Sequence, residues 1–393
     1  MMVLALNAGS SSLKFAVYDV PDRTRDPALV VAGQFAGLGG EVGFTARAAD
    51  GAAICGSQTV QALPDAAAAL DPALAWLEGR GFDAGNFAAV GHRIVHGGAR
   101  FSEACVVDDR AAEDLERLAV LAPLHMPFGL GALRAVRVRL PHVPQIACFD
   151  TAFHATQPDI ATRLPLPARY RDKGYRRYGF HGLNYRHVTE VLPRLADAPL
   201  PSRLLVLHLG NGASACAIRD GRSIATTMGY SPLDGLVMST RAGAIDPGVL
   251  LALMRDEGLD VAALETLLYK RSGLLALSGR SSDMRTLLAC EDASAKTAVA
   301  SFCYWAARHA GSLIAALGGL DAVVFTGGIG ENAAPVRTAI VEYFAWLGAK
   351  IDPSRNAAGG ALLSPDGAAP SIWCVRADEE AMIARHVAHL LAA

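Results

Sequence analysis

Two arginines stand among small residues in two separate segments of the chain. Arg93 lies in GHRIVHGG, residues 91–98, and Arg241 lies in STRAGAIDPG, residues 239–248. A guanidinium carries a planar fork of N–H donors that fits a carboxylate or a phosphoryl group through two hydrogen bonds. The pair therefore indicates a clamp for such a group. The alternative is that Arg93 is a surface residue and its neighbouring histidines bind loop carbonyls.

Acidic and imidazole side chains occur beside aromatic and small residues. Asp150 follows a predicted strand in FDTAFH, and His181 lies in RRYGFHG. Ends of strands are where α/β sheets bind ligands, which indicates a functional role, and the alternative is a capping aspartate and a packed histidine. Asp283 and Arg285, in SGRSSDMR, suit a ribose and the edges of a base, although a helix N-cap explains the aspartate equally well.

Three glycine-bearing turns, at residues 9–12, 210–214 and 327–332, follow predicted strands. Glycine lets backbone amides approach an anion closely. One such turn is ordinary, but three of them, two in matched hairpins, favour a site for nucleotide phosphates. The sequence lacks the motifs GxxxxGK[ST], HExxH and GxSxG, and a GxGxxG between strand and helix. No Cys/His cluster has zinc spacing, whereas Mg²⁺ held by few protein groups and a phosphate would leave little signature.

The turn at residues 9–12 joins two alternating apolar runs, 3–7 and 14–18, which predict a β-hairpin. The same layout returns without a gap at residues 205–220, where five of sixteen positions are identical. The repeat is separated by 201 residues, about half the chain, which favours two duplicated halves over a solenoid. The alternative is coincidence between two hairpins.

Helical and extended patterns alternate along the rest of the chain, which predicts a mixed α/β protein. The stretch 157–203 looks irregular, and a domain junction near residue 150 fits best. We expect helices over 109–121, 129–140, 296–317, 335–347 and, with Asp378 as N-cap, 378–391, and buried strands over 87–90, 145–149 and 322–326.

Composition narrows the class of protein. The 393 residues are 52% hydrophobic with a net charge of -2, which disfavours nucleic acid and anionic membranes as partners. Seven cysteines without a CxxC pair indicate free thiols in a reducing compartment. No secretory signal and no apolar run of about 18 residues is present, so we expect a soluble, cytoplasmic protein.

Taken together, the motifs resemble those of acetate kinases, in the same order and over essentially the whole chain. They are LALNAGSSSLKF, GHRIVHGG, APLH, FDTAFH, RRYGFHG, HLGNGASACAI, MGYSPLDGLVMSTRAGAIDPG, SGRSSDMR, FTGGIGEN and ADEEAMIAR. The resemblance implies an α/β fold of two duplicated ribonuclease-H-like lobes, the actin-like ATPase fold, with the active-site cleft between them. It places residues 1–152 and about 380–393 in the first lobe, and 153–379 in a second lobe that binds nucleotide and forms a homodimer.

The activity implied by the resemblance is reversible, direct in-line phosphoryl transfer from ATP to acetate, giving acetyl phosphate and ADP. Arg93 and Arg241 would bind acetate and then stabilise the transferring phosphoryl group, with His181 donating to the same charge. Asp150 would organise the site, and His125 in APLH matches an active-site histidine of the family. A propionate or butyrate kinase is the alternative within the family, and a non-enzymatic ATP-gated clamp is the alternative from another class.

The resemblance also implies the nucleotide and metal sites. Asn7 and Glu379 would hold Mg²⁺, with Mn²⁺ as a substitute. The residues implied for ATP or ADP are Ser12, Lys14, His208, Asn211, Gly212, Asp283, Arg285, Gly328, Gly330 and Asn332.

A small apolar set matches the family's pocket for the acyl methyl group, and it consists of Val95, Leu124, Phe180 and Pro232. If Val95 lies on the same strand face as Arg93, it lies beside the carboxylate clamp. The chain departs from the usual pattern at Met126 and Phe128, which follow APLH, and at Ser239 and Arg280. These departures affect the expected substrate pocket and nucleotide preference rather than the reaction.

Overall fold

The computed structural model describes residues 1–21 and 25–391. The chain forms two compact units, each with its own sheet. Unit 1 comprises residues 1–153, 182–184 and 378–393, and unit 2 comprises residues 154–181 and 185–377.

The sheet of unit 1 has eight strands in the order β5-β4-β3-β2-β1-β6-β8-β7. β1 and β2 form the predicted hairpin, and β1, β6 and β8 are parallel neighbours. The strands are β1 (Met2–Ala8), β2 (Ser12–Asp19), β3 (Ala28–Ala36), β4 (Val42–Ala48), β5 (Ala53–Val60), β6 (Phe87–Ile94), β7 (Cys105–Val106) and β8 (Gln145–Phe149).

The sheet of unit 2 repeats the central part of the first. Its order is β11-β10-β9-β12-β13, with an antiparallel hairpin β9–β10 and parallel neighbours β9, β12 and β13. The order β3-β2-β1-β6-β8 in unit 1 has the same pairing directions. The second hairpin and the duplicated α/β fold are therefore confirmed. The strands are β9 (Arg203–Leu209), β10 (Ala213–Arg219), β11 (Arg222–Thr226), β12 (Ala322–Thr326) and β13 (Ser371–Cys374).

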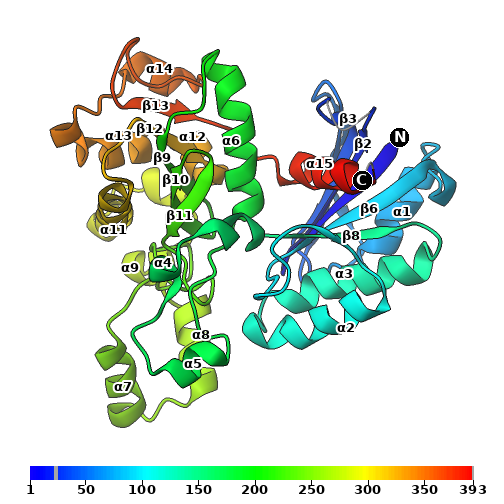
Figure 1. Cartoon of the computed structure of the whole chain (residues 1–393), viewed down its shortest axis with the longest axis horizontal. Coiled ribbons are helices and arrows are strands. Elements are labelled where there is room, and N and C mark those ends of the chain that lie inside the picture. Colours follow the sequence, from blue (N-terminus) through cyan, green and yellow to red (C-terminus); the bar gives the residue numbers. More distant parts are fainter. Residues whose placement is uncertain (22–24, 392–393) are drawn as a thin grey trace. The chain divides into compact units, whose positions relative to one another are not determined.

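Helices cover both faces of the sheet of unit 1 (Figure 1). Alternate residues of β1 show why: Leu4 and Leu6 pack toward α1 and α3, whereas Val3 and Ala5 pack toward α15. Gly91 in β6 allows α15 to lie close, because a Cβ there would lie 2.4 Å from Ile383. The helices are α1 (Leu70–Glu78), η1 (Ala84–Asn86), α2 (Asp109–Arg117), η2 (Leu118–Leu121), α3 (Met126–Arg139) and α15 (Glu379–Leu391), and η3 (Ala152–Thr156) spans the boundary of the units.

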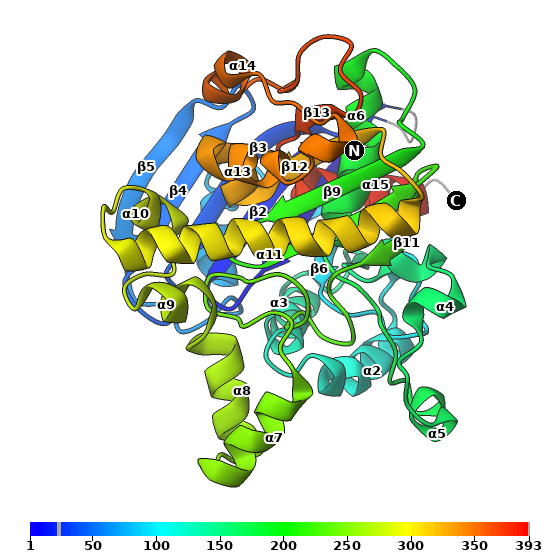
Figure 2. The same ribbon diagram turned by 90° about the vertical axis from the view of Figure 1, so that its left-hand side faces the viewer.

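A long helix, α11 (Ala293–Leu317), packs on β9, β10 and β11 of unit 2 (Figure 2). The small residues Ala295, Ala298, Ala306 and Ala310 on its buried side allow this close packing. The other helices are α4 (Asp159–Thr162), α5 (Ala168–Asp172), α6 (Gly182–Ala196), α7 (Pro247–Asp256), α8 (Val261–Lys270), α9 (Gly273–Ser278), α10 (Met284–Leu288), α12 (Gly327–Asn332), α13 (Ala334–Glu342), η4 (Ala345–Leu347) and α14 (Pro353–Ala358).

The interpretation of residues 157–203 as irregular is wrong, because α6 occupies fifteen of them. Its apolar residues Leu183, Tyr185, Val188 and Leu192 follow a helical spacing and are all at most 2% exposed. Prolines and arginines before the helix obscured this period. The predicted helix 109–121 ends earlier as α2 and continues as the 3₁₀ helix η2. The predicted helix 335–347 ends earlier as α13, and a two-residue turn separates it from the 3₁₀ helix η4. Strands β8 and β12 have the predicted bounds.

The seven cysteines are free thiols, as expected from their spacing. Burial raises the pKa of Cys148 and Cys216, so these thiols stay protonated near neutral pH. Within residues 1–21 and 25–391, no helix is long and apolar enough to span a membrane.

Candidate active site

Three polar side chains of unit 1 lie where neighbouring parallel strands end. Asn7 is the penultimate residue of β1, Arg93 is the penultimate residue of β6, and Asp150 directly follows β8. Because parallel strands end at the same edge of a sheet, these residues come together there. The predicted strand over 87–90 extends to Ile94 in the structure, so Arg93 is part of the strand rather than of a loop.

Arg93 and Asp150 form a fork-to-carboxylate pair. Nε of Arg93 donates to Oδ1 and Oδ2 of Asp150 at 3.0 and 3.1 Å, and NH2 donates to Oδ2 at 2.6 Å. The Asp150 side chain is 1% exposed and that of Arg93 is 20% exposed. Burial raises the pKa of Asp150, and the guanidinium opposes this rise. The pair thus fixes the orientation of the Arg93 guanidinium, and NH1 of Arg93 faces Asn7 and Glu379.

The first turn of α15 brings two glutamates to the same edge. Nδ2 of Asn7 donates to Oε2 of Glu379 and to Oε1 of Glu380, both at 2.9 Å. NH1 of Arg93 donates to Oδ1 of Asn7 at 3.1 Å and lies 3.4 Å from Oε2 of Glu379. The helix begins as predicted, since Oδ1 of Asp378 accepts from N of Ala381 at 2.9 Å. The structure thus brings together Asn7, Arg93, Asp150 and Glu379.

Glu380 was not among the predicted site residues. Its side chain is partly buried, and the loss of water around the carboxyl group raises its pKa, while Lys14 opposes the rise. Because Glu379 and Glu380 both accept from Nδ2 of Asn7, the amide oxygen Oδ1 of Asn7 faces Arg93. A second acid in the first turn of a helix was the only signal for Glu380 in the sequence, and a helix dipole explains such acids without a site.

The donor atoms at this edge suit Mg²⁺ bound together with phosphate. Magnesium prefers oxygen ligands and commonly takes one or two protein carboxylates, with the remainder from substrate phosphates and water. Glu379 and Glu380 supply two carboxylates and Asn7 an amide. Among the residues described, no group of three or more His, Cys, Asp or Glu side chains could hold a metal by itself. The residues fit an ion that is shared with a phosphate.

The segment before α3 carries the predicted residues Leu124 and His125. His125 is at the N-cap position of α3, and both side chains are partly buried. Met126 is 1% exposed and belongs to the apolar core between α3 and β8, so its side chain is core rather than pocket. Val95 lies after the end of β6 and packs partly against the same core. Val95 is therefore one residue past the strand that carries Arg93, and its place in the acceptor pocket stays a prediction.

His181 anchors the second group of predicted residues, in unit 2. It adopts a left-handed conformation, with φ of 59°, immediately before α6. Its Nδ1 lies 2.8 Å from Oγ of Ser214, and its ring stacks on His208 with the centroids 4.1 Å apart. Tyr185 also bonds to Oγ of Ser214. Ser214 was predicted only as the end of the turn 210–214, but it lies within β10 and its side chain is buried.

Arg241 and His181 converge on Gly212. A Cβ on this glycine would lie 3.4 Å from both NH1 of Arg241 and Nε2 of His181. NH1 of Arg241 also donates to the carbonyl oxygen of Pro232 at 3.1 Å. The turn after β9 therefore presents backbone, a guanidinium and an imidazole at one place.

Two of the glycine-bearing turns lie side by side in unit 2. A Cβ on Gly210 would lie 3.9 Å from the backbone N of Gly328 at the start of α12. Nδ2 of Asn332 donates to the carbonyl oxygen of Gly328 at 2.8 Å, and Oγ of Ser239 donates to Oδ1 of Asn211 at 3.2 Å. Gly330, within α12, is buried. Ser239, which departs from the usual family pattern, thus positions Asn211, a residue predicted to bind nucleotide.

The remaining predicted residues are more dispersed. Oδ1 of Asp283 accepts from N of Thr286 as the N-cap of α10, and Oδ2 pairs with Arg285 at 3.1 Å. These two residues contact each other rather than the groups above. Ser12 begins β2 and is partly buried, Lys14 is exposed opposite Asn7 in the hairpin, and Phe180 is 1% exposed.

Comparisons with known proteins cover the whole chain. The sequence model of the Acetokinase family matches residues 2–385. The chain is 45% identical to an acetate kinase of Rhodopseudomonas palustris over 392 residues, which covers 98% of this chain and 97% of that protein. It is 44% identical to an acetate kinase of Rhizobium meliloti, with 100% and 98% covered.

Two solved structures are similar over nearly their full lengths. A propionate kinase of Francisella tularensis superposes with a TM-score of 0.88 at 33% identity, covering 98% of each chain. An acetate kinase of Porphyromonas gingivalis superposes with a TM-score of 0.86 at 33% identity, covering 99% of each chain.

Proposed function

Because the chain belongs to the acetokinase family, we propose that it is an acetate kinase that transfers a phosphoryl group reversibly between ATP and acetate, with acetyl phosphate and ADP as products. The observation that carries this proposal is the position of Arg93. Its guanidinium lies at the ends of three parallel strands, with its Nε and NH2 edge held by Asp150 and its NH1 toward Asn7 and Glu379.

The chemistry follows from charge. A carboxylate is already a nucleophile at neutral pH, so the reaction needs no strong general base. The barrier lies in bringing two anions together, and fixed cations lower it. In unit 1, Arg93 would neutralise the acceptor and the transferring group, and Asp150 would act as a positioning residue through it. In unit 2, Arg241 and His181 would donate to the charge of a phosphoryl group, since both converge on Gly212.

The nucleotide would bind to unit 2 through its two adjacent glycine-bearing turns. The Gly210 turn and the start of α12 offer backbone donors that no Cβ obstructs. Asn7 and Glu379 would hold the Mg²⁺ that accompanies ATP, and this ion would neutralise phosphate charge and orient the phosphates in line. Asp283, which is partly buried, and Arg285, which is exposed, would contact the nucleoside.

One coupled assay tests the function. ADP production would be measured with MgATP and a panel of acetate, propionate, butyrate and hexoses. Acetate-dependent turnover is expected, together with hydroxamate-trapped acyl phosphate. Hexose-dependent turnover, or slow ATP hydrolysis that is independent of any carboxylate, would refute the proposal.

The metal assignment predicts a specific change in Glu379→Gln. This variant keeps the shape and a hydrogen-bonding oxygen but loses the charge, so we expect the half-saturating Mg²⁺ concentration to rise about tenfold or more. Asp109→Asn is the matched control, because Asp109 is also an acid in the first turn of a helix, and its side chain is 95% exposed. Unchanged magnesium titrations in both variants would show that Glu379 only begins a helix.

The acceptor pocket predicts a preference for short acids. One methylene is worth about 1 to 3 kcal/mol, so we expect kcat/KM for acetate to exceed that for propionate about tenfold or more. Val95→Ala should narrow this ratio by improving propionate. Val107→Ala, in the same apolar core, should leave the ratio unchanged. A wild-type preference for propionate would make the chain a propionate kinase, and an unchanged ratio in Val95→Ala would make Phe128 the next candidate.

We further propose that the protein is a cytoplasmic homodimer. The free state of all seven thiols supports a reducing compartment. Exposed apolar side chains on and around α7 and α8 of unit 2 support a self-association surface. They are Ile245, Val249, Leu251, Met254 and Val261. Light scattering of the purified protein measures the oligomeric state directly.

A further inference from the structure

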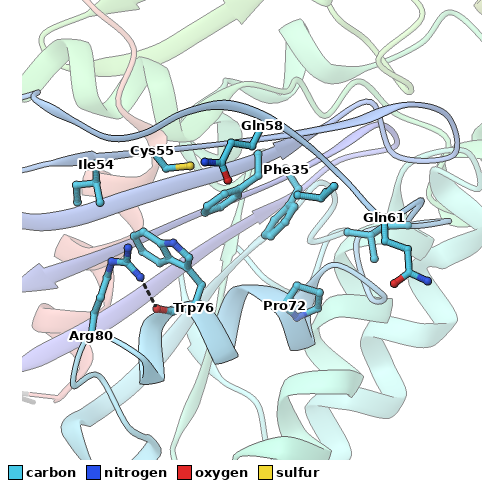
Figure 3. Close-up of a pocket in the computed structure, with 11 residues that line it drawn as sticks. Phe35, Ile54, Cys55, Gln58, Gln61, Pro72, Trp76 and Arg80 are labelled. Carbon is cyan, nitrogen blue, oxygen red and sulfur yellow. Dashed lines mark hydrogen bonds between the residues drawn. The ribbon is translucent and has the colours of Figure 1, made fainter.

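A cavity of about 530 Å³ lies in unit 1 between α1 and the strands β3 to β5 (Figure 3). None of its lining residues is among the residues assigned to phosphoryl transfer. Pockets for small molecules commonly measure about 300 to 1,000 Å³ and combine apolar walls with a few polar groups. The cavity therefore has the size of a binding site that the proposed reaction does not use.

Its inner wall is aromatic. The ring centroids of Phe35 and Phe44 lie 4.6 Å apart. The ring of Trp76 contacts Phe44 edge-on, with 5.5 Å between the two centroids. Phe35 and Phe44 are at most 5% exposed, so these rings are held in place by the core. Phe35 and Phe44 therefore form the closed floor of the cavity, and the partly exposed Trp76, Ile54 and Pro72 leave apolar surface for a flat ligand.

The rim carries a single cation. The guanidinium of Arg80 stacks on the Trp76 ring, with Cζ 3.8 Å from its centroid, and NH1 donates to the carbonyl oxygen of Trp76 at 3.2 Å. Figure 3 shows this side chain at one end of the cavity, with the amide of Gln61 at the other. The stacking and the hydrogen bond favour this orientation of the exposed guanidinium.

The Nε and NH2 edge of Arg80 remains available. Arg93 uses this same edge to hold the carboxylate of Asp150. In the described part of the chain, Arg80 forms no ion pair, and no Asp or Glu is among the residues lining the cavity. Since one guanidinium edge matches one planar carboxylate, the charge of the cavity suits a monoanion rather than a phosphate dianion.

We propose that this cavity is a binding site for a small aromatic carboxylate. The ring system would lie over Phe35 and Phe44, against Trp76, Ile54 and Pro72, and the carboxylate would accept from Nε and NH2 of Arg80. Gln58 and Gln61 supply amide groups at the rim.

Titration calorimetry with naphthalene-2-carboxylate tests the proposal on the full chain. We expect saturable binding at one site per chain, about 10- to 100-fold weaker for Arg80→Gln, since a hydrogen bond to a charged group contributes about 1.5 to 3 kcal/mol. Naphthalene-2-carboxamide, which has the same shape without the charge, should bind correspondingly weakly to the wild type. Saturating acetate and ADP should not displace the carboxylate.

Arg308→Gln is the matched control, because Arg308 stacks on Trp305 in unit 2 with Cζ 4.6 Å from the ring centroid. It should leave the affinity unchanged. Ile54→Glu places a negative charge on an exposed position of the rim and should weaken the carboxylate more than the amide. Unchanged thermal midpoints of these surface variants confirm that they fold. The proposal fails if no saturable binding occurs, if Arg80→Gln binds like the wild type, if the amide binds as tightly, or if acetate and ADP compete.

Discussion

Replacing Arg241 by alanine is expected to lower kcat/KM for acetate by about 10²- to 10⁴-fold, which corresponds to roughly 3 to 5 kcal/mol of transition-state stabilisation. The reason is that a guanidinium held beside the glycine turn of β9 and β10 would meet charge that develops during transfer. Arg93→Ala should produce a loss of similar size. Lysine should restore either activity only in part, because it lacks the planar fork.

Arg241 gives the cleaner test of the two. Its NH1 bonds to the carbonyl oxygen of Pro232, whereas Arg93 neutralises the buried Asp150, so that Arg93→Ala also removes a stabilising partner. Arg203→Ala is the matched control. Arg203 pairs with Asp321 through Nε and NH2, as Arg93 pairs with Asp150, and it has no assigned role in the reaction. Steady-state kinetics with acetate decides the matter. Turnover near the wild-type level in Arg241→Ala would remove this residue from the mechanism.

Asp150→Ala is expected to have the largest effect on stability. Removing one partner of a buried ion pair leaves the other charge without compensation, which typically costs about 3 to 5 kcal/mol. Here the remaining contacts of Arg93 with Asn7 and Glu379 reduce that cost, so the lower end of the range is expected. Activity should fall as well, because the guanidinium loses the carboxylate that orients it.

Urea unfolding followed by circular dichroism measures this change in free energy. Asp321→Ala is the control, since its pair with Arg203 is much more exposed, and we expect it to change stability far less. Asp150→Asn keeps the shape and should recover part of the stability but little of the activity. Equal stabilities for Asp150→Ala and Asp321→Ala would mean that the buried pair is not a structural support.

The sequence by itself was sufficient for features that depend on local pattern. The alternation of β1 and β2 predicted a hairpin, and its repetition at β9 and β10 predicted the duplication that the two sheets confirm. Strands β8 and β12 had the predicted bounds, because buried parallel strands consist of short apolar runs. The position of Asp150 directly after a strand likewise indicated a site at a sheet edge.

Only the tertiary structure decided which of these residues meet. Asn7 and Glu379 are 372 positions apart, and Gly91 and the apolar face of α15 bring them into contact. Glu380 and Ser214 carry no local signal that separates them from an ordinary helix start or a buried hydroxyl. The cavity between α1 and β3 to β5 forms where these elements pack together, and no single segment contains it. Local patterns determine elements, whereas packing between elements distant in sequence determines which side chains share a site.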